Sequence, residues 1–369
     1  MANLNTYKRR RCLLVTDEED EAPPSPQASP SRPPRPPTPP KDIRHVYNAP
    51  FAIYEDWEGT RWTALKGKQV TQPRCLDWPL LRRLKLDKAI ETHLKNMGLY
   101  KFSQTTPPGL LPLHLEFLCT LNMTADKSEL HCRMLNRPCV VTYRIMNEVF
   151  GFHPKRLKGI PDTWVAANAW KELTGLPTWT GQGAPSNQLI DSDIGVLHKF
   201  LSFCVVGKEQ ANKVNASEAY MLWCAKRKKK IDATTIIWNQ LHTMARHGGF
   251  KPSLSPISTA LALHFRLYPP TQVPDHLRAS VTRPIDRSEL KTFVAADFTI
   301  IPQAQRPNVR SILLQLNRGE GTSSSARHVL DDDDEDDDAE EEEPAPPPAF
   351  VCDPEAGPSN AFSAVPGSL

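Results

Sequence analysis

The chain contains 369 residues, of which 36 are prolines and 24% are charged. Its formal net charge is +3, but the acidic segment at 331–343 alone contributes −12, so the remaining residues carry +15. No apolar run approaches the ~20 residues that a membrane-spanning helix requires. We therefore expect no membrane partner.

Both ends of the chain have compositions that oppose folding. Residues 23–40 contain ten prolines, which lack a backbone donor and interrupt helices and strands. The segment at 331–343 contains twelve acidic residues, which repel one another and have no apolar surface to bury. The sequence predicts a disordered Pro-rich tail at 1–41, a folded domain at 42–317, and a disordered acidic and Pro/Ala-rich tail at 318–369.

Helical periodicity dominates the folded part. The apolar spacing over 86–97 predicts a helix that Gly98 ends, and Pro112 is placed to open the next helix. Apolar residues at 130–135 and 139–143 flank a turn-like link at 136–138 and predict a hairpin. The predicted fold is therefore mainly α, a compact helical domain with one small β-hairpin, flanked by disordered termini.

More helices are expected after the hairpin. Thr142 is placed to cap a helix that Gly151 closes. A further helix over 161–175 is expected to begin at Asp162 or Thr163 and to end at Gly175. The Gly/Pro-rich segment at 176–190 follows and is the best candidate for a domain break.

Three strong helical patterns fill the second half. The first, at about 192–206, is apolar over a wide face, which is typical of a buried helix. The second begins with a capping box of Asn215 and Glu218, and the third is capped at Asp232 and stopped by Gly248 and Gly249. We expect three side chains of these helices to share one core: Phe200, Trp223 and Leu241.

Five consecutive basic residues lie between the last two helices: Lys226, Arg227, Lys228, Lys229 and Lys230. Cations at a helix end complement its partial negative charge, but one or two suffice. Two interpretations remain open: a solvated turn, or contacts to nucleic acid or to a nuclear import receptor. A second basic cluster on the predicted N-terminal tail has the same candidate role: Lys8, Arg9, Arg10 and Arg11.

No motif for phosphate binding, dinucleotide binding, serine hydrolysis or metalloproteolysis occurs. The eight cysteines lack zinc-ligand spacing and lie largely in apolar runs. Asp191 and Asp193 are interpreted as helix capping, and His131 and Cys132 should face opposite sides of a strand. We expect no catalytic, cofactor-binding or metal-binding residue. With no signal peptide, we expect a nuclear or cytoplasmic protein, the basic clusters favouring the nucleus.

Three ordered stretches resemble one family: GLLPLHLEFLCTLNM with CRMLNRPCVVTYRIMNEVFGFHP, then AWKELTG, then SDIGVLHKFLSFCVVGKEQANKVNASEAYMLWCAKRKKKIDATTIIWNQL. Together they resemble the Athila-type protein encoded by plant retrotransposons, over about 75–268. The resemblance implies origin in a mobile element and brings no catalytic activity. The chain lacks the zinc knuckle of a nucleocapsid protein and the Tyr-x-Asp-Asp of a reverse transcriptase.

The leading hypothesis is therefore a non-enzymatic, retrotransposon-derived protein that binds protein or nucleic acid, with self-association left open. An alternative is a host-adopted nuclear regulatory or chromatin-associated protein. A third is a divergent nuclease or transposase, which a cluster of carboxylates in one cleft would favour.

Overall fold

The computed structural model describes residues 41–105, 107–152, 159–247, 251–274, 276–277 and 279–319. Contacts within the chain divide it into two units, Met1–Leu314 and Gln315–Leu369. The segment at 176–190, predicted as a break, lies inside the first unit. The predicted tail at 318–369 lies outside the described residues except at its start, where the last helix continues to Gly319, and the tail at 1–41 lies outside them except for Lys41.

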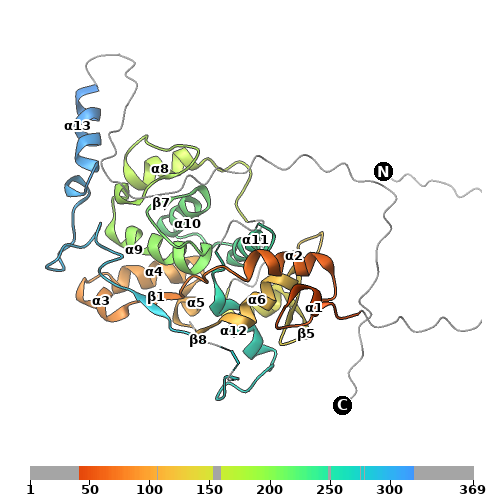
Figure 1. Ribbon diagram of the computed structural model, residues 1–369. Helices are drawn as coiled ribbons and strands as arrows, with labels where there is room; N and C mark the ends of the chain where they lie inside the picture. Colours follow the sequence, from red (N-terminus) through yellow and green to blue (C-terminus); the bar gives the residue numbers. More distant parts are fainter. Residues whose placement is uncertain are drawn as a thin grey trace, which may run out of the picture. The chain divides into compact units, whose positions relative to one another are not determined.

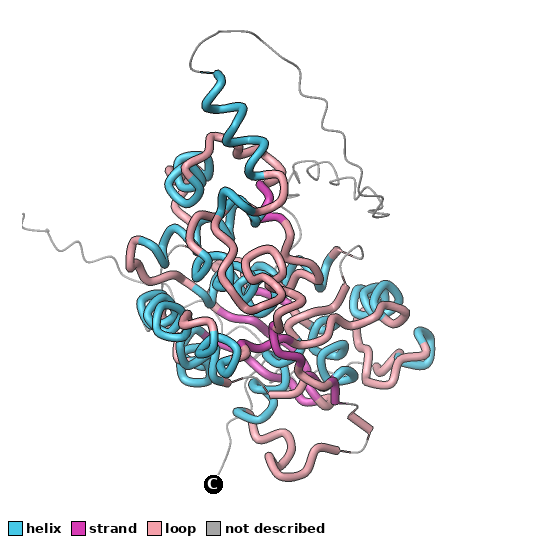
Figure 2. Tube along the Cα trace, turned by 90° about the vertical axis from the view of Figure 1, so that its left-hand side faces the viewer, coloured by secondary structure: helices cyan, strands magenta, loops and turns pink. Residues whose placement is uncertain are grey.

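Helices dominate the described residues, and the strands are short (Figures 1 and 2). The helices are α1 (Arg44–Tyr47), α2 (Asp56–Leu65), α3 (Trp78–Arg83), α4 (Asp87–Met97), α5 (Tyr100–Gln104), α6 (Leu111–Thr120), α7 (Tyr143–Phe150), α8 (Ala166–Thr174), α9 (Ser192–Leu201), α10 (Ala216–Lys226), α11 (Ala233–Arg246), α12 (Ser255–His264) and α13 (Val309–Gly319). A π-helical turn, η2 (Ser202–Val206), extends α9, and 3-10 turns form η1 (Ser186–Gln188) and η3 (Gln303–Gln305).

The strands form more sheet than the single hairpin that the sequence predicts. They are β1 (Arg74–Leu76), β2 (Gly109–Leu110), β3 (Asn122–Met123), β4 (Glu129–Met134), β5 (Arg137–Thr142), β6 (Ala184–Pro185), β7 (Lys213–Val214), β8 (Ala279–Ser280) and β9 (Arg283–Ile285). The predicted hairpin is β4–β5, but β3 adds a third antiparallel strand to it. Three two-stranded pairs also form: β1–β9, β2–β8 and β6–β7. They were missed because each joins segments distant in sequence.

The turn of the hairpin lies one residue earlier than predicted. Leu135 and Asn136 both have positive φ, as a two-residue type I′ turn requires. Pro138 is not in the turn but pairs with Arg133 within the sheet. A proline is tolerated there because β5 is an edge strand, so one side of it needs no backbone donor.

Local signals place several helix ends correctly. Gly98, Gly151 and Gly175 each adopt the left-handed conformation immediately after a helix, which glycine reaches without steric cost. Thr142 accepts a hydrogen bond from the backbone N–H of Ile145, as predicted for a cap. The start of α8 was predicted too early, since the helix begins at Ala166.

Two helices occupy the centre of the first unit. One is α10, which packs against α4, α8 and α9, and the other is α6, which packs against α2, α11, α12 and β4. All residues of α6 from Leu113 to Thr120 are buried. Phe200 and Leu241 are buried in the same core, as predicted, but Trp223 is only partly buried. α10 turns its other faces inward, so Trp223 lies at the edge of the core.

Candidate nucleic-acid interface

The predicted basic run lies where α10 ends. The helix opens with the predicted capping box: the Asn215 side chain accepts from the Glu218 N–H, and the Glu218 carboxylate accepts from the Asn215 N–H. Asp232 caps α11 by accepting from the Thr235 N–H at 3.0 Å. Because both helix boundaries are fixed by capping residues, the intervening cations occupy a short, defined connection.

Lys228 closes α10 in an unusual conformation for its residue type. The Lys229 N–H donates to the Cys224 carbonyl at 2.8 Å, and the Lys228 N–H donates to the Ala225 carbonyl at 3.2 Å. These two bonds form a Schellman motif, in which the residue after the C-cap is left-handed and most often glycine. Lys228 has φ of +54°, so a lysine occupies a position that favours glycine.

Replacing Lys228 with glycine is therefore expected to stabilise the protein, although it removes a cation. Relief of the left-handed strain outweighs the added freedom of the unfolded chain, for a net gain of about 0.5–1 kcal/mol. Chemical denaturation measures the change. Lys230→Gly is the matched control, because Lys230 is not among the residues with positive φ and should lose stability or stay unchanged. Equal effects of the two glycines would contradict the assignment.

Two of the five cations form ion pairs with acidic side chains from other segments. Lys226 Nζ lies 3.1 Å from Asp191 Oδ2, and Arg227 Nε lies 2.7 Å from Glu172 Oε1. Glu172 also accepts from Trp223 Nε1 at 3.0 Å. The hydrogen bond from Arg227 lowers the pKa of Glu172 despite partial burial. These acidic partners lie 35 and 55 residues from the run in sequence, so nothing in the run itself indicated them.

The other three cations are exposed and form no ion pair with any described residue; they are here called the lysine surface: Lys228, Lys229 and Lys230. Lys229 Nζ lies 4.4 Å from the centre of the Trp223 ring, a cation–π contact. Trp223 in turn stacks on Tyr220. The structure thus joins an aromatic ring to the predicted cations. The second predicted cluster, Lys8 to Arg11, lies outside the described residues.

A buried polar network beneath η2 contains serine, histidine and carboxylate side chains. Ser202, His198 and Glu218 are all fully buried. Ser202 Oγ lies 2.5 Å from Glu218 Oε1 and 3.0 Å from His198 Nε2. Because the Ser202 hydroxyl donates to the carboxylate, it accepts from His198 Nε2–H. A catalytic triad needs the opposite order, in which the histidine accepts the serine proton and the carboxylate binds the other ring nitrogen.

This network therefore has the geometry of a structural hydrogen-bond network. Lys208 Nζ lies 2.8 Å from Glu218 Oε2 and compensates its charge. Burial by itself raises the pKa of Glu218, but the hydrogen bonds and nearby charges outweigh it and lower the pKa to about 2. Burial lowers the pKa of His198, and the nearby Glu218 carboxylate opposes this effect. The network ties α9, η2 and the start of α10 together.

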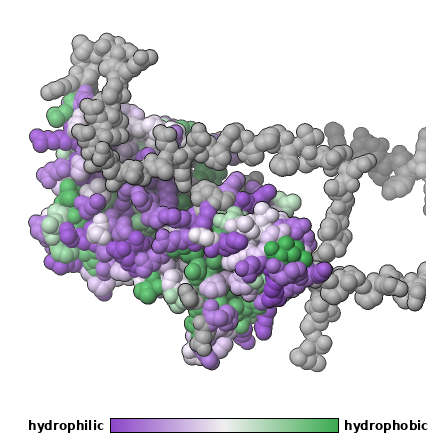
Figure 3. All heavy atoms as spheres, in the orientation of Figure 1, coloured by the Kyte–Doolittle hydropathy of each residue, from purple (hydrophilic) through white to green (hydrophobic). Residues whose placement is uncertain are grey.

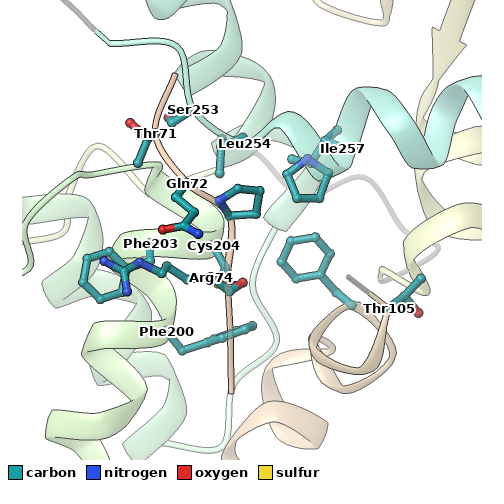
Figure 4. A pocket seen from close by; sticks show the side chains of 13 residues that line it. Thr71, Gln72, Arg74, Thr105, Phe200, Phe203, Cys204, Ser253, Leu254 and Ile257 are labelled. Carbon is teal, nitrogen blue, oxygen red and sulfur yellow. Dashed lines mark hydrogen bonds between the residues drawn. The ribbon is translucent and has the colours of Figure 1, made fainter. Parts of the chain in front are cut away.

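The cavity near β1 is too small for a substrate. It has a volume of about 30 Å³ and lies between β1, η2 and α12 (Figure 4). Two buried polar atoms on its wall, Thr71 Oγ1 and Arg74 Nη1, have no hydrogen-bond partner among the described residues. A cavity of this size with polar groups holds about one water molecule. A shallower depression of about 300 Å³ lies beside Cys75 and Trp78 and is open to solvent.

The described residues were also compared with the requirements of a metal site and of a membrane-spanning helix. They contain no group of three or more His, Cys, Asp or Glu side chains arranged to hold a metal ion. His131 and Cys132 alternate between partial and full burial, as predicted for opposite faces of a strand. Within the described ranges, no helix combines the length and the apolar character needed to cross a membrane.

Comparison with family models, with curated proteins and with solved structures finds no match to this chain. Any function must therefore be inferred from the residues and their geometry. Figure 3 shows that the face turned to the viewer in Figure 1 is mostly hydrophilic, with small separate apolar areas.

Proposed function

We propose that this chain is a non-enzymatic protein that binds nucleic acid through the lysine surface, and that it derives from an Athila-type plant retrotransposon. The proposal rests on a difference between the cations of the basic run: two are paired with carboxylates and three are not. Lys226 and Arg227 are balanced by acidic partners, whereas the lysine surface is exposed beside a tryptophan ring. Exposed cations interleaved with an aromatic ring are typical of surfaces that bind nucleic-acid backbones.

The charge distribution supports the same proposal. Without the acidic segment at 331–343 the residues carry +15, which favours association with polyanions. The run ends a helix and turns sharply at Lys228, so its cations lie on a fixed support. A fixed support lowers the entropy lost when phosphates are bound, because the backbone is already ordered.

Changing Lys228, Lys229 and Lys230 together to glutamine is expected to weaken nucleic-acid binding and to flatten its salt dependence. Each lost phosphate contact lowers the slope of log affinity against log salt by about 0.7 to 0.9. Titration of labelled RNA and DNA at several salt concentrations measures the slope. Changing three exposed lysines elsewhere, Lys85, Lys213 and Lys291, to glutamine removes the same charge and should leave the slope nearly unchanged.

Equal slopes for the wild-type protein and the variant of the lysine surface would refute this role. The basic run would then be only a solvated turn at the end of α10. The alternative of a host-adopted nuclear protein makes a different prediction with the same variant. Nuclear accumulation of a reporter fusion would fall while binding in vitro persisted. A receptor that reads the run as an extended peptide would have to break the contacts of Lys226 and Arg227 first, which favours Lys8 to Arg11 as the import segment.

A nuclease or transposase is the third proposal and the least supported. Two acidic groups lie near the lysine surface. Asp191 is paired with Lys226, and Glu172 is paired with Arg227. Glu218 and Glu116 are buried and hydrogen-bonded to the protein itself. Incubation of the purified chain with labelled DNA, RNA and divalent cations tests this alternative, and cleavage that Glu172→Gln abolishes would replace our proposal.

A further inference from the structure

A second basic surface lies on elements that the lysine surface does not include. It combines one end of α11, part of α2 and the turn between β3 and β4, and is here called the α2–α11 surface. Both helices pack against α6, on the right-hand side of Figure 1. Its residues are Trp57, Arg61, Lys127, His242 and Arg246.

On α2 the surface presents an exposed aromatic ring with a cation over it. Trp57 retains 39% of its exposure, which is high for a tryptophan. The Arg61 guanidinium lies one helical turn further on, with its Cζ 4.4 Å from the centre of the Trp57 ring. Arg61 Nη1 also donates to the Leu121 carbonyl at 2.5 Å, which fixes the side chain at the end of α6.

On α11 two further basic side chains lie one turn apart, His242 and Arg246, so they share a face of the helix. Burial lowers the pKa of His242, and the positive charges of Arg246, Arg61 and Lys127 lower it further. The charge of Arg246 likewise opposes that of Arg61, whose pKa is lowered chiefly by burial. Cations from three separate elements are therefore held close enough to repel one another.

Two of the neighbouring acidic groups already have partners within the protein. Glu58 lies on α2 near Arg61, but it is buried and binds Arg133 at 2.6 and 2.8 Å. Asp126, next to Lys127, accepts hydrogen bonds from Thr124 and Ser128 within its own turn. The folded chain thus holds several positive charges near an exposed ring, an arrangement that favours association with an anionic ligand.

We propose that the α2–α11 surface binds single-stranded nucleic acid, with a base stacked on Trp57 and phosphates at Arg61 and Arg246. An exposed aromatic ring accepts an unpaired base, whereas the bases of a duplex are already stacked on one another. This proposal goes beyond the function proposed above because it concerns different residues and does not require the lysine surface to bind.

The test is binding of the full-length chain to labelled oligothymidylate of about 16 nucleotides, within the range of single-strand site sizes, and to a duplex of equal length. Trp57→Ala is expected to weaken single-strand binding by about tenfold, with duplex binding nearly unchanged, and Trp57→Phe should restore most of the affinity. Arg246→Gln should weaken single-strand binding and lower its salt slope by about 0.7. Arg82→Gln, an exposed arginine near the end of α3, is the matched control and should have no effect.

Each measurement is made both in the wild-type chain and in the chain that carries glutamines at the lysine surface. Loss caused by Trp57→Ala in both backgrounds supports the α2–α11 surface even if the lysine surface proves inactive. Unchanged single-strand affinity of Trp57→Ala, with an unchanged melting temperature, overturns the proposal. An equal loss for single strand and duplex overturns it too, since the surface would then bind phosphates without stacking.

Discussion

Replacing Glu218 with alanine is expected to destabilise the protein by about 3–5 kcal/mol, the cost of breaking a buried ion pair by removing one partner. The Glu218 side chain is fully buried and binds Lys208 Nζ at 2.8 Å, Ser202 Oγ at 2.5 Å and the Asn215 N–H at 2.8 Å. Alanine would remove the acceptor of Ser202 and of the Asn215 N–H, would leave Lys208 Nζ only the Lys213 carbonyl, and would abolish the capping box of α10. Chemical denaturation of the two proteins measures the difference.

A glutamate in a partly exposed ion pair provides the control for this substitution. Glu91 binds Lys95 across one turn of α4 at the surface, so Glu91→Ala should leave the melting temperature nearly unchanged. If Glu218→Ala were no more damaging than Glu91→Ala, the buried network described above would be wrong.

The same carboxylate sets the direction of the pH dependence. The pKa of Glu218 is lowered to about 2 in the folded protein, so its contribution is present above its unfolded pKa near 4.5 and is lost as the pH falls towards 2. The pKa of His198 is also lowered, by burial, so protonation of the unfolded state removes stability below about 6.5. Both effects predict acid destabilisation. Glu218→Gln should have a shallower fall between pH 4.5 and 2.

Replacing Glu116 with alanine is expected to cost about 2–4 kcal/mol, since it leaves two backbone donors without partners at ~1–3 kcal/mol each. Glu116 Oε2 accepts from the Leu135 N–H and Oε1 from the Asn136 N–H, both at 2.7 Å. These are the two turn residues of the β4–β5 hairpin, and Leu135 adopts a left-handed conformation that leucine disfavours. The buried carboxylate holds the turn in place.

Thermal and chemical denaturation of Glu116→Ala measure this effect. Glu129→Ala is the control, because the Glu129 side chain is 40% exposed and pairs with His131 at the surface. A second variant, Leu135→Gly, removes the unfavourable conformation, so it should recover part of the loss when combined with Glu116→Ala. A loss for Glu116→Ala no larger than that for Glu129→Ala would show that the turn does not depend on Glu116.

Glu116 also links two stretches that lie apart in the sequence. The Leu-x-x-Glu-Phe-Leu stretch at 113–118 lies in α6, where its glutamate caps a turn formed by the later CRMLNR stretch. Arg133 of that stretch binds Glu58 of α2. The ordered motifs therefore interact with one another in the fold, and their residues have structural roles. These structural roles do not indicate a chemical activity.

The sequence by itself determined the features that depend on near neighbours. The ends of helices at Gly98, Gly151 and Gly175 and the capping box of Asn215 were predictable, because a cap is completed within a few residues of chain. The alternation of β4 and β5 was predictable for the same reason, since adjacent side chains of a strand point to opposite faces.

Only the tertiary structure decided the contacts that join distant segments. The pairing of β1 with β9, the partners of Lys226 and Arg227, and the grouping of Trp57 and Arg61 with Arg246 leave no local pattern in the chain. The basic run could be found from sequence because five charges are consecutive, but which of them are balanced depends on acidic residues that folding brings to it. The α2–α11 surface could not be found at all, because its residues are scattered along the chain and meet only where α2 and α11 pack against α6.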